Sequence, residues 1–252
     1  MTPTLSPTAQ ALVFGIPVFL FTYMLNMFFI TVIYHRGLCH GALMLKSRFR
    51  GFAIEAGSWI TGIDPKAWVC MHRMHHQFSD TERDPHSPHR YGVFGVFFGQ
   101  LKSYEKTLAG LIRNRIQYTS VVSDLEFPVH WLNRKRLWAL PYFLHAVLAV
   151  ALAYWVGNAW IGGAYWLGMM SHPVQGWLVN SFAHRFGYRN FETPDDSRNN
   201  PWIAWAVMGE GYQNNHHHNP GSANFSVRAG EWDPGFLLCR MGQAAGLLEI
   251  RQ

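Results

Sequence analysis

The chain has 252 residues and a formal net charge of +6, and only 14% of its residues are charged, against about 25% in an ordinary soluble protein. This composition excludes a disordered chain, a collagen-like fibre and a small disulfide-linked scaffold. The three cysteines, Cys39, Cys70 and Cys239, are an odd number without CxxC spacing, so neither a disulfide framework nor a cysteine-based zinc site is indicated. The missing charges belong to residues 1–34 and 137–184, which contain no Asp, Glu, Lys or Arg.

Both uncharged stretches are long enough to cross a membrane. As a helix, residues 11–34 would extend about 36 Å, more than the roughly 30 Å hydrocarbon core of a bilayer. A cleaved signal peptide is the alternative, but the run is too long and no positive charge precedes it. The second stretch divides near Gly157 into residues 137–157 and 160–184, for which we expect a hairpin of two spanning helices.

The basic residues indicate how these helices are oriented. All 21 Lys and Arg residues lie in residues 35–136 and 185–252, which the positive-inside tendency places in the cytoplasm, with the N-terminus outside. No nucleic-acid-binding motif accompanies the charge, so we expect it to meet lipid headgroups and expect no nucleic-acid partner. Residues 51–63 and 91–101 are apolar but short, which favours interfacial helices. The sequence therefore predicts one all-α membrane domain, residues 1–252, with about three spanning helices, interfacial helices and a cytosolic helical cap.

Histidines are numerous and grouped. Of the fourteen in the chain, His72, His75 and His76 lie at i, i+3 and i+4 in WVCMHRMHHQF. This spacing puts the three rings on one face of a helix, with their nitrogens converging. Because imidazole is a common metal ligand, the pattern favours half of a metal site over a solvated helix face.

Another group repeats this spacing near the end of the chain. In GEGYQNNHHHNP, Gln213, His216 and His217 lie at i, i+3 and i+4, and His218 is a neighbour turned off that face. A surface run of histidines is the alternative, but it does not explain why the spacing recurs.

Two further groups are weaker when taken alone. His35 and His40, in YHRGLCHG, are turned about 140° from each other on an ideal helix. They converge only if the helix ends or distorts, and Gly37 makes local unwinding cheap. Asn180 and His184 are i and i+4 at the cytoplasmic end of the third expected span, so they share a face.

The strong positions supply eight imidazoles, which exceeds the four ligands of a tetrahedral zinc ion and suits two metal ions. Ligand chemistry alone does not distinguish iron from zinc or copper. The expected ligands are His35, His40, His72, His75, His76, His184, His216 and His217. The weaker candidates are His145 and His172 within the spans, and His86, His89 and His130 in loops or near headgroups.

The order HRGLCH, HRMHH, NSFAH and GEGYQNNHH resembles the histidine boxes of the integral-membrane fatty acid desaturases, specifically the Δ9 or stearoyl-CoA desaturase branch. The resemblance continues through DPH, GYR, DSR and Pro220 and covers roughly residues 11–248. It implies a non-haem di-iron centre held by the eight histidines, with Asn180 reaching one metal through water, and O2-dependent desaturation of an acyl chain. It also implies a fatty acyl substrate on coenzyme A, a carrier protein or a lipid, and a ferredoxin, rubredoxin or cytochrome b5-type electron donor.

Three features depart from that branch. Gln213 stands where the branch usually has the first histidine of its third box, although some other desaturase branches carry Gln there. Cys70 and Met71 occupy positions where the animal acyl-CoA enzymes have an Arg-Asp pair near the coenzyme, which puts an acyl-CoA carrier in question. The single span before the first box, where eukaryotic members have a hairpin, suggests a shortened form in a bacterial inner membrane.

Selectivity along an acyl chain must come from the shape of its site, because successive CH2 groups are chemically alike. We predict that Trp68, one turn before His72, and Trp177 line or bend a closed acyl tunnel, with interfacial anchoring as the alternative. A membrane alkane or fatty-acid hydroxylase, which can share these boxes, is a competing function. A membrane metal transporter or sensor is another, although its ligands belong near the middle of the bilayer.

Overall fold

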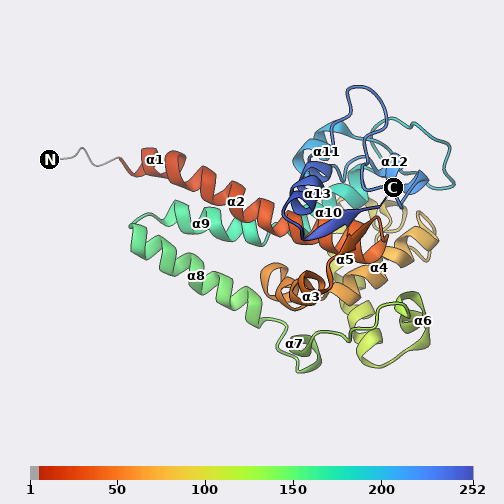
Figure 1. The fold of residues 1–252 in the computed structure, drawn as a ribbon, viewed down its shortest axis with the longest axis horizontal. Helices are drawn as coiled ribbons and strands as arrows, with labels where there is room; N and C mark the ends of the chain where they lie inside the picture. The colour runs from red at the N-terminus through yellow and green to blue at the C-terminus, as the bar shows by residue number, and fades with distance from the viewer. Residues whose placement is uncertain (1–5, 252) are drawn as a thin grey trace.

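An arm of apolar helices projects from a broader helical body in the computed structural model, which describes residues 6–251 (Figure 1). The arm comprises α1 (Pro7–Gln10), η1 (Ala11–Gly15), α2 (Ile16–Met27), α8 (Leu140–Val156) and α9 (Ala159–Met169). The first part of the body comprises η2 (Phe28–Cys39), β1 (Leu43–Leu45), α3 (Ser47–Thr61), α4 (Pro65–Phe78), α5 (Pro88–Ile112), α6 (Ile116–Thr119), η3 (Ser120–Val122) and α7 (Trp131–Arg134). The second part comprises α10 (His172–Trp177), η4 (Leu178–Phe182), α11 (Pro201–Ala206), α12 (Gln213–His218), α13 (Pro234–Ala244) and β2 (Leu248–Ile250).

The first expected span is part of one continuous helix that connects the arm to the body. It runs from Thr8 to Cys39, is 32 residues long and is the one helix within residues 6–251 that is long and apolar enough to cross a membrane. Its segments η1 and η2 are π-helical, and α2 lies between them. The helix α8, Leu140–Val156, is apolar but shorter.

The second uncharged stretch folds as a hairpin that continues into a broken helix. Gly157, in the left-handed conformation at φ 69°, ends α8, and the side chain of Asn158 accepts a hydrogen bond from the Trp160 N–H at 3.0 Å to start α9. Residues 160–184 do not form the single helix that we expected, because α9 ends at Met169 and α10 begins two residues after Met170. Pro173 explains the break, since it has no N–H to donate and its ring would clash with the preceding turn.

Close packing of α9 against both neighbouring helices depends on two glycines. A Cβ atom at Gly162 would lie 2.3 Å from the carbonyl oxygen of Ala149 in α8, and one at Gly168 would lie 2.8 Å from the carbonyl oxygen of Phe19 in α2. Small residues at such positions let helix backbones approach closely, as in membrane helix pairs. By contrast, a Cβ atom at Gly163 would meet nothing within 4 Å.

We therefore expect Gly162→Ala to lower the stability of the arm by about 1–3 kcal/mol, because the added methyl group forces α8 and α9 apart. The matched variant Gly163→Ala should be neutral or slightly stabilising, since it adds helix propensity in open space. Thermal unfolding of the purified protein in detergent measures both effects. Equal midpoints for the two variants would contradict the packing described here.

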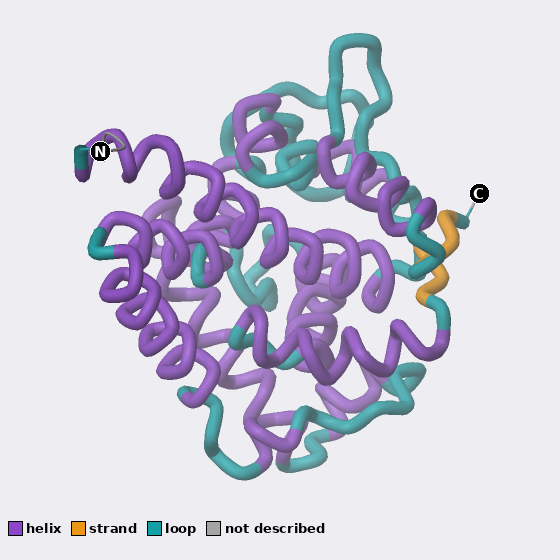
Figure 2. The backbone as a smooth tube through the Cα atoms, turned by 60° about the vertical axis from the view of Figure 1, so that its left-hand side comes forward, coloured by secondary structure: helices purple, strands orange, loops and turns teal. Residues whose placement is uncertain are grey.

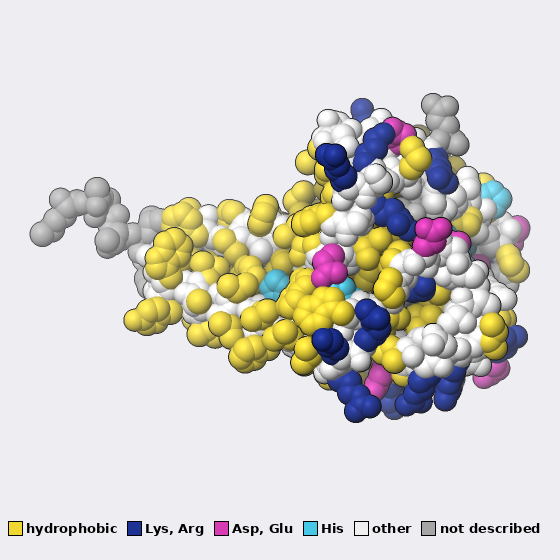
Figure 3. All heavy atoms as spheres, turned by 60° about the horizontal axis from the view of Figure 1, so that its bottom comes forward, with side chains coloured by type: hydrophobic (Ala, Val, Ile, Leu, Met, Phe, Trp, Pro, Cys, Tyr) yellow, Lys and Arg dark blue, Asp and Glu magenta, His cyan; other side chains and the backbone are white. Residues whose placement is uncertain are grey.

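The outer surface of the arm is apolar. Tyr154 and Trp155 are 89% and 84% exposed, and large apolar side chains of α2, α8 and α9 are exposed along the same arm. Figure 3 shows hydrophobic side chains covering the visible face of the arm, whereas Lys and Arg gather over the body. An exposed apolar surface of this extent marks contact with lipid, so the arm indicates membrane association.

The body contains the two short apolar runs. Residues 51–63 lie mostly within α3, and residues 91–101 lie within α5, which is interrupted at Gly92 (φ 67°). The Asp64 carboxylate starts α4 by accepting the Ala67 N–H at 2.9 Å. The structure is mostly helical, as predicted, and adds one small antiparallel sheet in which β1 pairs with β2 beside the C-terminus (Figure 2).

Candidate metal centre

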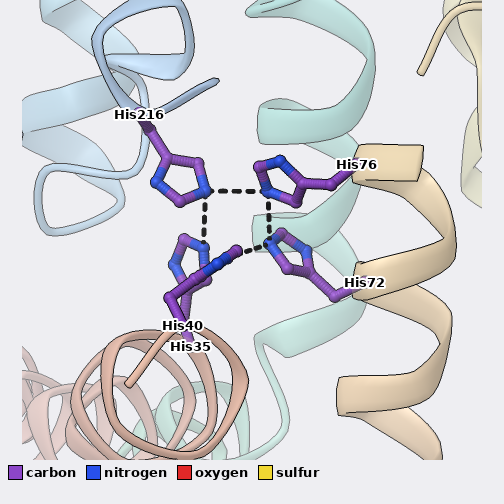
Figure 4. Close-up of side chains that lie close together, drawn as sticks. All are labelled: His35, His40, His72, His76 and His216. Atoms are coloured by element: carbon purple, nitrogen blue, oxygen red, sulfur yellow. Dashed lines mark hydrogen bonds between the residues drawn. The ribbon is translucent and has the colours of Figure 1, made fainter. Parts of the chain in front are cut away.

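Five imidazole rings from three separate parts of the chain meet in the body (Figure 4). His35 and His40 come from η2 and its end, His72 and His76 from α4, and His216 from α12. The Nε2 atoms of neighbouring rings lie 3.0 Å apart for His35 and His216, 3.1 Å for His40 and His72, 3.0 Å for His72 and His76, and 2.9 Å for His76 and His216. A ring of inward-facing imidazole nitrogens suits a cation, because each unprotonated nitrogen offers a lone pair.

A π-helix brings His35 and His40 together. The His40 N–H donates to the carbonyl oxygen of His35 at 3.1 Å, an i to i+5 bond that places residue i+5 back over residue i. Their ring centroids are 5.0 Å apart. The expected distortion is therefore present, but it is a widening of the helix and not an unwinding at Gly37, which lies inside η2.

Three further rings form a second group. The nitrogen atoms of His75, His184 and His217 lie within 4.8 Å of one another. The three rings come from α4, from the segment after η4 and from α12. In each ring the Nε2 atom is buried and has no hydrogen-bond partner. Because a buried polar atom without a partner is costly, three such atoms aimed at one place indicate a missing ligand.

The residues of each histidine box divide between the two groups. His72 and His76 contribute to the first group, whereas His75 from the same helix contributes to the second. His216 and His217 divide in the same way. The i, i+3, i+4 spacing thus predicts which rings face inward, but not that they converge on two positions in place of one.

Carboxylates hold the outer nitrogen of four rings, and the sequence interpretation missed all of them. The Nδ1 atoms lie 2.7 Å from Glu210 for His35, 3.0 Å from Asp84 for His75, 2.9 Å from Asp80 for His184 and 2.8 Å from Asp195 for His217. Such a bond fixes the ring tautomer and turns Nε2 inward, as in carboxylate-histidine-metal triads. The signal that could have revealed them is the acidic residues of FSDTERDPH, DDS and GEGY, which sit beside the boxes.

Buried charges around Glu210 anchor the first group to the body. Arg36 Nη1 lies 2.9 Å from Glu210 Oε1, and Arg36 Nη2 lies 2.9 Å from Asp233 Oδ2. Burial alone would raise the pKa of Glu210, but His35 and the charge of Arg36 outweigh it and lower the pKa. Glu210 is therefore held ionised beside His35.

Four rings of the first group resist protonation. Burial, together with the neighbouring imidazoles, lowers the pKa of His40, His72, His76 and His216 well below 6.5. In the second group burial lowers the pKa of His217 to about 4. For His184 burial also acts to lower the pKa, but the hydrogen bond and charge of Asp80 outweigh it and raise it. Neutral imidazole is the form that binds metal.

We expect the metal-free protein to lose stability as the pH falls below about 6.5. Because His40, His72, His76 and His216 resist protonation in the folded state, the unfolded chain binds more protons in this range, and the free energy of unfolding falls. His184 acts with the opposite sign, since its pKa is raised.

Denaturant unfolding of chelator-treated protein between about pH 8 and pH 5.5 measures this dependence. His76→Asn should make it shallower by removing one of the resisting rings. Unfolding midpoints independent of pH over this range would contradict neutral burial of the rings.

A mostly apolar cavity adjoins the first group, through His35 and His72. Its polar lining consists of His35, His72, His86, Gln100, His172, Gln175, Asn180, Glu210 and Gln213. Its other walls include Met27, Ile30, Ile63, Trp68, Met71, Tyr104, Tyr142, Val179 and Val207. The cavity thus combines an apolar wall with a few polar groups next to the histidines, as ligand sites commonly do.

Asn180 and Gln213, the two amide residues of the histidine boxes, lie at this cavity. Asn180 Nδ2 donates to Gln100 Oε1 at 3.5 Å, and Gln213 Nε2 donates to the carbonyl oxygen of Glu210 at 2.8 Å. His218 lies outside both groups, because it is exposed and its ring stacks on Phe191 at 3.8 Å.

The two tryptophans have different positions. Trp68 lines the cavity and stacks on His72, with ring centroids 4.9 Å apart and planes 11° apart. Trp177 is not among the lining residues, because its Nε1 donates to the carbonyl oxygen of Val93 at 2.7 Å and its ring packs against Phe97.

The remaining histidines also differ from one another. His89 is exposed and pairs with Asp196 at 2.6 Å, and the buried His130 pairs with Glu55 at 3.0 Å. His86 lies in a loop, as expected, but it is buried against His75 and not near headgroups.

A sequence model of fatty acid desaturases matches residues 11–228, a range that contains every histidine of the two groups and the four carboxylates that hold them. The chain belongs to the fatty acid desaturase family. The resemblance seen in the histidine boxes is thereby confirmed.

Named desaturases are among the relatives of this family member. It is 35% identical over 222 residues to icosanoyl-CoA 5-desaturase of Limnanthes douglasii, covering 86% of this chain and 59% of that protein. It is 32% identical over 225 residues to Delta-9 acyl-lipid desaturase 1 of Arabidopsis thaliana, covering 86% and 68%. It is 30% identical over 221 residues to sn-1 stearoyl-lipid 9-desaturase of Anabaena variabilis, covering 86% and 76%. The desaturase chain thus spans less than two thirds of the length of the first of these relatives.

Proposed function

We propose that this chain binds two iron ions, one in each histidine group, and uses O2 to introduce a cis double bond, near Δ9, into a saturated fatty acyl chain. The observation that carries the proposal is the convergence of eight imidazoles into two groups beside a mostly apolar cavity. Membership of the desaturase family supports it. The position near Δ9 is supported by two relatives whose names specify Δ9 enzymes.

The residues present fit a pair of iron ions. Three unpartnered Nε2 atoms define the second position, and five converging Nε2 atoms define the first. Imidazole suits iron and resists oxidation better than thiolate does. The buried Cys39 lies in the first box but belongs to neither group, so no thiolate competes among the described residues.

When bound, the two ions supply the redox chemistry that acid–base side chains lack toward an unactivated methylene group. Overall, one O2, two external electrons and two protons convert CH2–CH2 into CH=CH and two molecules of water. The chain itself orients four of the ligand rings through their carboxylates, which turns Nε2 of each ring inward.

The cavity residues would position the acyl chain. We assign apolar contact to Met27, Ile30 and Val179, which lie on its walls. Trp68 would fix the chain beside His72, on which it stacks. Asn180 and Gln213, the polar lining residues, would act toward the metals directly or through water. A fixed chain in a shaped site explains how one methylene pair is chosen among similar ones.

The membrane arrangement is part of the same proposal. We place the N-terminus outside a bacterial inner membrane and the metal centre on the cytoplasmic side, with residues 1–252 acting as one domain. The long helix Thr8–Cys39 and the α8–α9 hairpin would provide about three crossings, supported by their exposed apolar surface. Both histidine groups lie in the body, not along the arm, which favours an enzyme over a transporter.

The substrate and electron donor are proposed by class. The acyl chain would be carried by coenzyme A, a carrier protein or a lipid, since the relatives include enzymes named for acyl-CoA and for acyl lipids. A ferredoxin, rubredoxin or cytochrome b5-type protein would deliver the two electrons.

Expression in a host that lacks unsaturated acyl chains should add a cis-alkene to the host lipids, because the wild-type centre would be complete. His217→Ala should abolish the product, whereas the neighbouring His218→Ala should retain it, since His218 lies outside both groups. Mass spectrometry of the lipids measures the outcome. An alcohol in place of the alkene would indicate a hydroxylase, and unchanged lipids despite iron-loaded protein and a competent reductant would overturn the proposal.

Asp195→Asn should weaken iron binding at the second position about 10–100-fold, because the carboxylate that orients His217 is lost. The adjacent Asp196→Asn is the matched control, since Asp196 pairs with the exposed His89 outside both groups. Iron titration of the purified protein compares the two variants. Equal affinities would show that the Asp195 carboxylate does not support metal binding.

A further inference from the structure

The two histidine groups are unequal in their donors. The first group contains five imidazoles and the second contains three. Gln213 lies one helical turn before His217 in α12, but its amide N–H donates to the carbonyl oxygen of Glu210 and it brings no imidazole. If each group holds one metal ion, as proposed above, the second ion has fewer nitrogen donors than the first.

A further buried imidazole, which the box pattern does not include, lies against His75 of this second group. His86 is 1% exposed, and both its Nδ1 and its Nε2 are buried without a hydrogen-bond partner. Its ring centroid is 4.4 Å from that of His75. The separations inside the second group are similar, at 5.0 Å for His75 and His184, 5.1 Å for His75 and His217, and 5.0 Å for His184 and His217.

The backbone holds His86 at this place through the same carboxylate that holds His75. The His86 N–H donates to Asp84 Oδ1 at 3.0 Å, and Asp84 Oδ2 lies 3.0 Å from His75 Nδ1. Ser87 and Pro88 begin α5 directly afterwards, and the Ser87 side chain accepts the His89 N–H at 3.1 Å. His86 is therefore fixed at its backbone, while its ring has no partner among the described residues and lines the cavity.

A buried imidazole serving only as packing would normally pair at least one ring nitrogen. His145 is such a case, because both of its nitrogens have partners, at 2.7 Å to the Tyr165 hydroxyl and at 3.0 Å to the carbonyl oxygen of Trp59. His86 differs in having neither. The atoms of His75, Asp84 and His86 also form a third set of donors within 4.8 Å of one another, which shares His75, but not His184 or His217, with the second group.

We propose that His86 is a fourth imidazole ligand of the second metal position, supplying on the cavity side the donor that Gln213 does not supply. This inference rests on the proposed function, because it needs a metal ion at that position. It extends the ligand set beyond the eight box histidines to a residue of the DPH segment, and it gives a partner to one of the two unpartnered ring nitrogens of His86.

The test measures the iron content and the iron affinity of purified protein in detergent, reconstituted anaerobically with Fe(II). Wild type should bind about two ions per chain. His86→Ala should keep the first ion and weaken the second at least about tenfold, and His86→Asn, which keeps a polar side chain of smaller size, should do the same. The matched control is His89→Ala, three residues along, which should bind two ions as wild type does.

Compensation separates a ligand from a merely structural residue. In His86→Ala, the additional change Gln213→His should restore binding of the second ion. The new imidazole would lie four residues before His217 in α12, at a position that lines the cavity. X-ray absorption of the iron, which averages over the two ions, should count about half an imidazole fewer per iron in His86→Asn than in wild type at saturating metal, because one ligand ring is lost across two ions.

The contrary outcomes are distinct. A His86→Ala protein that binds two ions with wild-type affinity and an unchanged imidazole count would overturn the inference while leaving the proposed function intact. A wild-type chain that binds no iron would overturn the proposed function and this inference with it.

Discussion

Carboxylate-to-imidazole bonds are the constraint on which the rest of the site depends. Glu210, Asp80, Asp84 and Asp195 each engage the Nδ1 atom of one inward-facing ring, so that its Nε2 points toward the centre. Asp80 is 104 residues from His184 and Asp195 is 22 residues from His217, so these bonds tie separate segments together, whereas Asp84 is only 9 residues from His75. Desolvation is tolerated because each buried acid has a hydrogen-bonding partner, as buried charges require. The carboxylate–imidazole contacts consequently contribute both to the packing of the body and to the geometry of the site.

The arm and the centre are mechanically continuous. The helix that carries the apolar surface at Thr8 ends, 32 residues later, in the π-helical segment that presents His35 and His40. Gly162 and Gly168 fix how closely α9 packs against its neighbours, and the cavity wall at Val179 follows directly in the same chain segment. A displacement of the arm would therefore move the cavity wall through the connected helix backbone, and not through flexible side chains.

Local geometry explains what the sequence could predict. The i, i+3, i+4 spacing depends only on the helix, so five of the inward-facing rings followed from it, namely His72, His75, His76, His216 and His217. Their division between two groups depends on where α12 and the segment at His184 pack, which no local pattern encodes. The π-helix at His40 likewise depends on tertiary contacts, and the acids and His86 lie in loops whose positions have no periodicity to read. Pro173 is visible in the sequence and could have predicted the break between α9 and α10. The length of the uncharged run favoured one continuous helix instead.

The positions of the histidine donors along the chain set the order in which the ribosome synthesises them. His35, His40, His72 and His76 are made within a short interval, so four of the five donors of the first group exist early in translation. The second group then has only His75 until His184 and His217 are added, roughly 5–30 seconds later at ordinary ribosomal speed. The nascent polypeptide therefore contains four of the five donors of the first group well before it contains the second and third donors of the other group.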